Sequence, residues 1–149
     1  MTAILKTFKI YTAGKMGGLS YDDQMYWRHK LEELVKERTY KNVVFVHPPE
    51  YYTYGATKHK TEHETRMWDL SQVKSSDVVV FDLTTISDSI GTLMELATVD
   101  AMNQFGYKSI YAIGVGIPNT DHPWINDCLL RQEYTLEDAA DYIARYLLV

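Results

Sequence analysis

Residues 77–83 read DVVVFDL, and this stretch decides the fold class of the chain. Four consecutive apolar residues between polar ends suit a short strand that is buried on both faces, as the strands of parallel sheets are. Similar apolar runs occur at 7–13, 42–47 and 108–114. Because parallel strands require long crossover connections, the segments between these runs are expected to contain helices.

Apolar residues at helical spacing occur in those connecting segments. After the first strand, Trp27, Leu31, Leu34 and Val35 follow one another at i, i+4, i+7 and i+8. Further helices are predicted over 62–75, 90–104, 124–130 and 136–148. In the helix over 90–104, the buried stripe is expected to consist of Ile90, Met94, Ala97 and Ala101.

This alternation of strands and helices predicts one α/β domain over residues 1–149. Right-handed crossovers then give a doubly wound, mostly parallel, flavodoxin-like or Rossmann-like sheet of four to five strands, with helices on both faces. Ligands of such sheets bind beyond the carboxyl ends of the strands, where the loops 14–20, 47–61 and 84–90 are expected. The segment 48–60, PPEYYTYGATKHK, is predicted to have no regular structure.

Composition excludes several classes of protein. A net charge of −5 argues against a nucleic-acid polymer as partner. The single cysteine, Cys128, rules out an intrachain disulfide and a cysteine-based zinc site, and its apolar neighbours predict a core position. No apolar run approaches the roughly 20 residues of a membrane span, and the N-terminal residues lack a signal-peptide core. We therefore expect a soluble cytoplasmic protein that does not contact a membrane.

Several familiar motifs are absent. GVGIPN at 114–119 lacks the third glycine of a dinucleotide fingerprint, and Gly14-Lys15 lacks the spacing and the Ser/Thr of a phosphate-binding P-loop. His59 and His63 are four residues apart, but no convincing third metal ligand lies nearby, so a solvated loop and helix start is the better interpretation. Neither a metal nor an organic cofactor is expected.

Two acidic residues flank the strand at 77–83. Glu95 lies in the second turn of the helix over 90–104, and Gly91 at i−4 leaves the surface beside it open. Asp69 lies on the preceding helix, so both carboxylates can meet at one end of the sheet. On spacing alone, a solvated helix glutamate is the better interpretation of Glu95, but the second acid favours a pair, and paired carboxylates suit glycosidic chemistry. Ser89 fits a helix N-cap, which would leave backbone N–H groups free to bind an anion.

The chain resembles the nucleoside 2-deoxyribosyltransferase superfamily, which includes deoxynucleoside 5′-monophosphate N-glycosidases. The resemblance covers nearly the whole chain. It is carried by IYTAGKMGGLSYDDQMYWR at 10–28, WDLSQVKSSDVVVFDL at 68–83, SIGTLMELATVDA at 89–101 and DHPWI at 121–125. It implies that Glu95 is a nucleophile that attacks C1′ of a 2-deoxyribosyl group, that Tyr11 orients this carboxylate, and that Asp69 helps the leaving base to accept a proton.

The resemblance also bears on the 5′ end of the substrate. Transferases acting on free nucleosides typically have an aspartate where this chain has Ser89, whereas the monophosphate hydrolases have a serine. Together with Lys15, and with Gly14, Gly17 and Gly18 allowing close approach of the backbone, this slightly favours hydrolysis of monophosphates. The alternatives are base exchange between deoxynucleosides and, in another class, a catalytically weak nucleotide-binding sensor.

Two further features of the family pattern concern quaternary structure and the base. His122 aligns with a polar residue that family members insert into the neighbouring subunit's site, which implies a homodimer or a higher even homo-oligomer; alternatively, His122 bonds its own turn. Tyr51, Tyr52 and Tyr54 have no family counterpart, and they could either stack on a base or pack their own loop.

Overall fold

The computed structural model describes residues 5–52 and 59–149, and its centre is a five-stranded sheet in the order β2-β1-β3-β4-β5. All neighbouring strands are parallel. The strands are β1 (Thr7–Ala13), β2 (Asn42–Val46), β3 (Val78–Asp82), β4 (Tyr111–Val115) and β5 (Arg131–Glu133). The predicted α/β doubly wound fold is therefore confirmed. β5 was not predicted, because its three polar residues carry no strand pattern.

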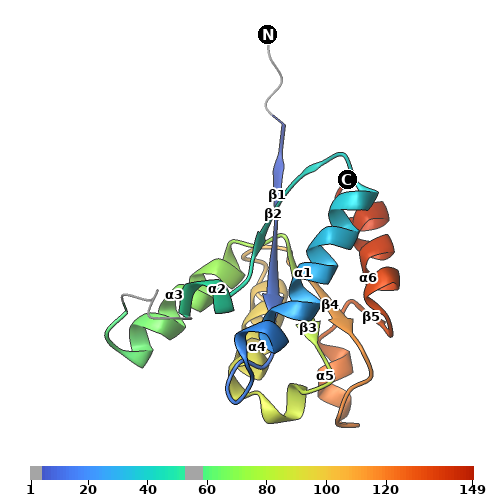
Figure 1. Ribbon diagram of the computed structural model, residues 1–149. Helices are drawn as coiled ribbons and strands as arrows, with labels where there is room; N and C mark the ends of the chain where they lie inside the picture. The colour runs from blue at the N-terminus through green and yellow to red at the C-terminus, as the bar shows by residue number, and fades with distance from the viewer. Residues whose placement is uncertain (1–4, 53–58) are drawn as a thin grey trace.

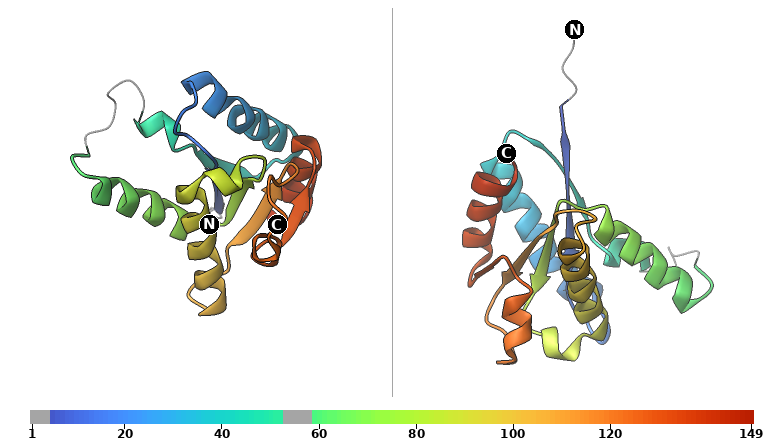
Figure 2. Two further views of the ribbon diagram at one scale, coloured as in Figure 1. Left: turned by 90° about the horizontal axis from the view of Figure 1, so that it is seen from below. Right: turned by 180° about the vertical axis from the view of Figure 1, so that it is seen from behind.

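Helices cover both faces of the sheet (Figure 1). They are α1 (Tyr21–Arg38), α2 (Pro49–Tyr52), α3 (Glu62–Lys74), α4 (Ile90–Gln104), α5 (Pro123–Asp127) and α6 (Leu136–Tyr142), with a 3₁₀ turn η1 (Ile86–Asp88) and a π-helical turn η2 (Ile143–Leu147). Viewed along the strands, α1 and α6 lie on one side of the sheet, and α3 and α4 lie on the other (Figure 2). Among the helices of the described residues, none is long and apolar enough to cross a membrane.

The core consists of two apolar clusters separated by the sheet. One lies under α1 and α6 and includes Ile10, Leu31 and Ile143, whereas the other lies under α3 and α4 and includes Tyr11 and Leu96. Because side chains alternate along a strand, the central strand β1 sends Ile10 to the first face and Tyr11 to the second. This alternation directs Tyr11 toward α4.

The predicted buried stripe of α4 is wrong. Ile90 and Met94 are 76% and 44% exposed, whereas Thr92, Leu96 and Val99 are buried against the sheet. Apolar or small residues occur at helical spacing on both sides of this helix, so periodicity alone could not select the side that packs. The consequence is that Met94 is available to line a cleft.

The segment predicted as irregular contains the single helical turn α2. Pro49 occupies its first position, where a proline is tolerated because the N–H that it lacks would have no partner within the helix. Tyr51 and Tyr52 belong to this turn, whereas Tyr54 lies outside the described residues. Cys128 is partly buried beside the second core cluster, at the end of α5.

Candidate active site

A two-lobed cleft opens at the carboxyl ends of β1 and β3. The outer lobe, about 450 Å³, lies between α3 and α4 and is lined by residues that include His63, Arg66 and Met94. The loop lobe, about 300 Å³, lies between residues 14–17 of the β1–α1 loop and the start of α4. Asp69, Gly91 and Glu95 line both lobes. The structure therefore brings the two predicted carboxylates together where the lobes meet.

Glu95 lies in the second turn of α4 with its carboxyl group turned inward. The residue as a whole is partly exposed, but its Oε2 atom is buried and has no hydrogen-bond partner in the described part of the chain. Burial raises the pKa of Glu95 to about 8; the Tyr11 hydroxyl and the Arg28 charge oppose this shift, and the Asp69 charge adds to it. A carboxyl group that titrates near neutrality in a cleft is a typical feature of a catalytic group.

Tyr11 is fully buried at the end of β1, beneath Glu95. Burial raises its pKa, and the negative charges of Glu95 and Asp69 raise it further. In the described residues its hydroxyl makes no hydrogen bond of ordinary geometry, although it lies close enough to the Glu95 carboxyl for each to affect the pKa of the other. The hydroxyl thus remains available to orient that carboxylate.

Asp69 is held by Tyr52, a residue for which the sequence left two roles open. The Tyr52 hydroxyl of α2 donates a hydrogen bond to Asp69 Oδ1 over 2.7 Å. Burial raises the pKa of Asp69, while this hydrogen bond and the nearby His59 oppose the shift. The Tyr51 ring packs on Trp68 with ring centroids 4.5 Å apart, and the Tyr52 ring meets Trp68 edge-on. The two described tyrosines therefore pack α2 against α3, and one of them also contacts a carboxylate of the cleft.

The start of α4 forms one wall of the loop lobe. Ser89 stands at the N-cap position, but its side chain makes no capping hydrogen bond. Its hydroxyl instead lies 2.6 Å from Thr92 Oγ1. The first backbone N–H groups of a helix have no partner within the helix, so those beside Gly91 can bind an acceptor. Lys15 and Asp88 line the same lobe with opposite charges.

The β1–α1 loop passes close to the sheet at Gly14. A Cβ atom built there would lie 2.9 Å from Trp27 Cζ2 and 3.2 Å from Asp82 Cβ, so a side chain cannot fit without a shift of its neighbours. At Gly17, by contrast, no atom lies within 4 Å of such a Cβ. Gly14 is thus required by packing, whereas Gly17 is open to the cleft.

Arg28 of α1 was not among the residues predicted for the site. It is fully buried, and it donates hydrogen bonds to the carbonyl oxygens of Thr12, Gly14 and Gln24. Burial lowers its pKa to about 10, although the charges of Tyr11, Glu95 and Asp82 oppose the shift. Arg28, Leu31 and Val35 are spaced at i, i+3 and i+7, which places Arg28 on the apolar face of the helix. This spacing could have predicted that Arg28 is buried.

His122 lies outside both lobes of this chain. It caps α5, where its Nδ1 accepts a hydrogen bond from the Trp124 N–H over 3.2 Å, so it bonds its own turn. A contribution to a neighbouring subunit's site stays a prediction. His63 lines the outer lobe. Over residues 5–52 and 59–149, no group of three or more His, Cys, Asp or Glu side chains is placed to hold a metal ion.

Comparisons with known proteins find relatives in structure. No protein-family model and no curated protein sequence matches the chain. A 2-deoxyribosyltransferase from the psychrotolerant bacterium Bacillus psychrosaccharolyticus superposes with a TM-score of 0.65 at 18% identity, covering 90% of this chain and 91% of that one. A conserved protein from Enterococcus faecalis V583 gives 0.66 at 16% identity, covering 95% and 100%. The chain therefore has the fold of a 2-deoxyribosyltransferase, as the resemblance implied.

Proposed function

We propose that the protein cleaves the N-glycosidic bond of 2′-deoxynucleosides or their 5′-monophosphates through a covalent intermediate on Glu95. The observation that carries this proposal is the buried Glu95 carboxyl at the meeting point of two lobes, with Asp69 beside it. A carboxylate in such a place can attack from one side of a ring whose two substituents point into different lobes. Deoxyribose linked to a base at C1′ and to a hydroxyl or phosphate at C5′ has this shape.

The reaction assigns a separate role to each group. A Glu95 oxygen forms a bond to C1′, the bond from C1′ to the base nitrogen breaks, and its electron pair leaves with the base. Asp69, whose pKa is raised by burial, supplies a proton to that base. The Tyr11 hydroxyl orients the attacking carboxylate. Water, or a second base, then attacks C1′ and releases Glu95.

The loop lobe is the site we assign to the 5′ end of the substrate. Lys15, the Ser89 hydroxyl and the free N–H groups at the start of α4 favour an anion, whereas Asp88 opposes one. This balance favours hydrolysis of monophosphates slightly over base exchange between free deoxynucleosides. The outer lobe, lined by His63, Arg66 and Met94, then accommodates the base.

A panel assay tests the proposal. The chain is incubated with each deoxynucleoside and its monophosphate, with and without acceptor adenine, and the products are resolved by chromatography. Free base with deoxyribose 5-phosphate identifies the hydrolase, and a new nucleoside identifies the transferase. We expect Glu95→Gln to lower kcat/KM by at least about 10³-fold, since it removes a covalent nucleophile.

Exposed Glu37 at the far end of α1 provides the matched control. Glu37→Gln should leave turnover unchanged. Release of base by Glu95→Gln at the wild-type rate would refute the covalent mechanism. Tight binding of deoxynucleotides by the wild type in calorimetry, without turnover of any member of the panel, would instead support the sensor alternative.

A further inference from the structure

A buried arginine without a carboxylate partner lies behind the candidate site. Among the described residues, no carboxylate oxygen forms an ion pair with Arg28, although the side chain is fully buried. Burying a charge is costly unless other groups compensate for the lost water. Here three backbone carbonyl groups compensate in part, which leaves a net positive charge in the interior beside β1.

The hydrogen bonds of Arg28 fix both its own position and that of the β1–α1 loop. Nη2 donates to the Gly14 carbonyl over 3.1 Å, Nε donates to the Thr12 carbonyl over 3.4 Å, and Nη1 donates to the Gln24 carbonyl. The guanidinium carbon lies 4.8 Å from the centre of the Trp27 ring. Since Gly14 lines the loop lobe, a residue that is itself inaccessible to substrate holds part of the cleft wall.

The charge of Arg28 reaches the carboxyl group of Glu95. Arg28 lowers the pKa of Glu95, and reciprocally Glu95 raises the pKa of Arg28. The titratable groups that face Glu95 or line the lobes beside it are Tyr11 of β1, Arg28 of α1, Tyr52 of α2, Lys15 of the β1–α1 loop, Asp88 of η1, and Glu62, His63, Arg66 and Asp69 of α3. Among the basic residues of this set, Arg28 is the one whose charge acts on the Glu95 pKa.

We propose that Arg28 is a positioning residue of this site, which holds the β1–α1 loop by its carbonyl groups and supplies a positive charge that favours the ionised form of Glu95, the form that attacks. This inference rests on the proposed function, because an ionised Glu95 matters only if it attacks. Burial and the neighbouring Asp69 both favour the protonated, unreactive form of Glu95. A fixed interior cation counteracts both without occupying the cleft.

The test measures the Glu95 carboxyl directly, so that it does not depend on turnover. The full chain is labelled with ¹³C at glutamate carboxyl groups, the Glu95 signal is assigned with Glu95→Gln, and its pKa is read from a pH titration. Arg28→Gln should raise the Glu95 pKa by about one unit, a tenfold change in proton affinity. Arg28→Lys, which keeps the charge, should raise it by clearly less.

Arg38→Gln is the matched control, because Arg38 lies on the same helix but contacts Leu34 and Asp141. It should leave the Glu95 pKa unchanged. Equal shifts in Arg28→Gln and Arg28→Lys, or no shift in a folded Arg28→Gln, would overturn the proposal. If Arg28→Gln does not fold, the wild-type Arg28 Nε–H resonance decides: it should titrate with the Glu95 midpoint, and a signal that is flat through that midpoint overturns the proposal.

A pH profile of kcat/KM links the same variants to catalysis. Its acidic limb should move to higher pH in Arg28→Gln and follow the Glu95 pKa measured by NMR. A fall in activity at every pH with an unmoved limb would mean that Arg28 is merely structural, and would overturn the proposal. If the wild type turns over no deoxynucleoside, the proposed function fails, and the NMR titration still decides whether Arg28 sets the charge state of Glu95.

Discussion

Glu95 places a carboxyl group in a buried environment that disfavours its charge, at the position from which the proposed attack would start. A carboxyl group whose pKa rises from 4.5 to about 8 on burial holds its proton more tightly in the folded chain than in the unfolded chain. Folding therefore favours its protonated form, and ionisation of the group lowers the stability of the folded protein. Stability associated with this group is fully present below about pH 4.5 and is lost as the pH rises through 8.

Replacing Glu95 with glutamine should consequently stabilise the protein in a pH-dependent manner. The difference in unfolding free energy between Glu95→Gln and the wild type should grow between pH 5 and pH 8.5, by on the order of 2–4 kcal/mol. Urea denaturation at several pH values measures it. A difference that stays constant with pH would show that Glu95 titrates normally in the folded state.

Tyr52 offers a second prediction at the scale of a single residue. Its hydrogen bond stabilises the ionised form of Asp69, so Tyr52→Phe should raise the Asp69 pKa further. If Asp69 donates the proton to the leaving base, the basic limb of the pH–rate profile should move upward by about half a unit to one unit.

Tyr51→Phe is the matched control, because the Tyr51 ring packs on Trp68 and its hydroxyl makes no hydrogen bond with the described residues. Its pH–rate profile should match that of the wild type. A basic limb that moves equally in both variants, or in neither, would argue that Tyr52 does not act on Asp69.

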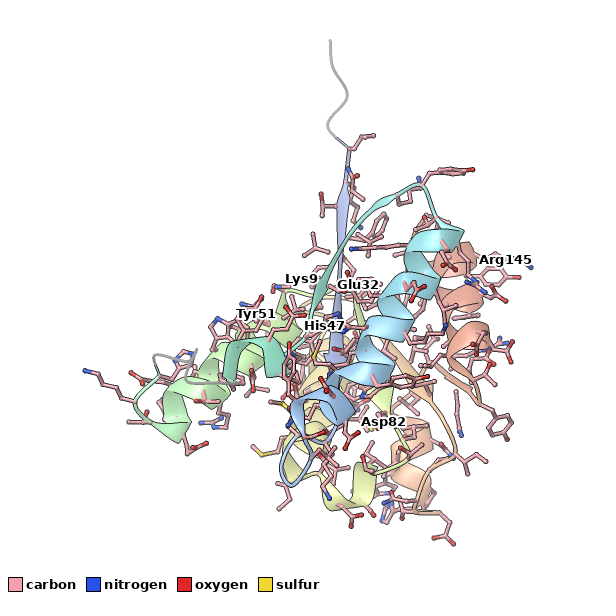
Figure 3. The ribbon with its side chains drawn as sticks, viewed as in Figure 1. Lys9, Glu32, His47, Tyr51, Asp82 and Arg145 are labelled. Atoms are coloured by element: carbon pink, nitrogen blue, oxygen red, sulfur yellow. The ribbon has the colours of Figure 1, made fainter. Side chains whose placement is uncertain are left out.

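At the scale of elements, α1 holds the end of β1 at two points one helical turn apart. Arg28 binds the Thr12 and Gly14 carbonyl groups. Glu32 binds the ring of His47, which in turn contacts the Thr12 hydroxyl. With its proton on Nε2, neutral His47 donates to Glu32 Oε1 over 2.6 Å and accepts from the Thr12 hydroxyl over 2.8 Å. Burial lowers the His47 pKa and so favours this neutral form. Figure 3 shows Glu32 and His47 where α1 passes β2.

Two of the three glycines of the β1–α1 loop allow this arrangement to be tested. Gly14→Ala should destabilise the protein by about 1–3 kcal/mol and raise KM, because its Cβ would displace Trp27 or the loop itself. Gly17→Ala has open space around its Cβ and should stay within about 0.5 kcal/mol of the wild type. Urea denaturation and steady-state kinetics measure both. Equal effects of the two substitutions would contradict the close packing at Gly14.

Sequence patterns predicted those elements whose burial is one-sided or complete. β3 is apolar throughout, and α6 with η2 has one apolar stripe, so strand and helix were recognised. The packing side of α4 could not be predicted because apolar residues occur around the whole helix, and α2 is too short to have a period. The two carboxylates shared by the lobes, Asp69 and Glu95, were anticipated. Arg28 and Tyr52 were not, since their roles depend on carbonyl and carboxylate groups distant in sequence.

At the scale of the whole molecule, the exposed apolar side chains near the cleft are consistent with an oligomer. Ile90, Ile117 and Trp124 are each at least 70% exposed. They belong to the start of α4 and to the β4–α5 region, which lie at the same end of the sheet (Figure 1). His122 caps α5 beside Trp124, so an interface that covers Trp124 would also include His122.

Hybrid dimers would test whether His122 acts between subunits. Glu95→Gln and His122→Ala should each be weakly active alone. When they are unfolded and refolded together, hybrids contain one site with both substitutions and one with neither, so about a quarter of wild-type activity should return. Activity that remains at the level of the parents, in a preparation shown by sedimentation to be dimeric, would place His122 outside the neighbouring site.

The division of the cleft into two lobes also affects how the protein can diversify. The loop lobe and Glu95 depend on β1, α1 and α4, which are packed into the core of the molecule, whereas the far wall of the outer lobe comes from α3. Substitutions at exposed positions such as Arg66 can therefore accumulate without disturbing the contacts by which Arg28 and Glu32 hold the end of β1. Under the proposed function, substitutions confined to α3 would change which base the outer lobe accepts, while Glu95 and the residues that position it stay the same.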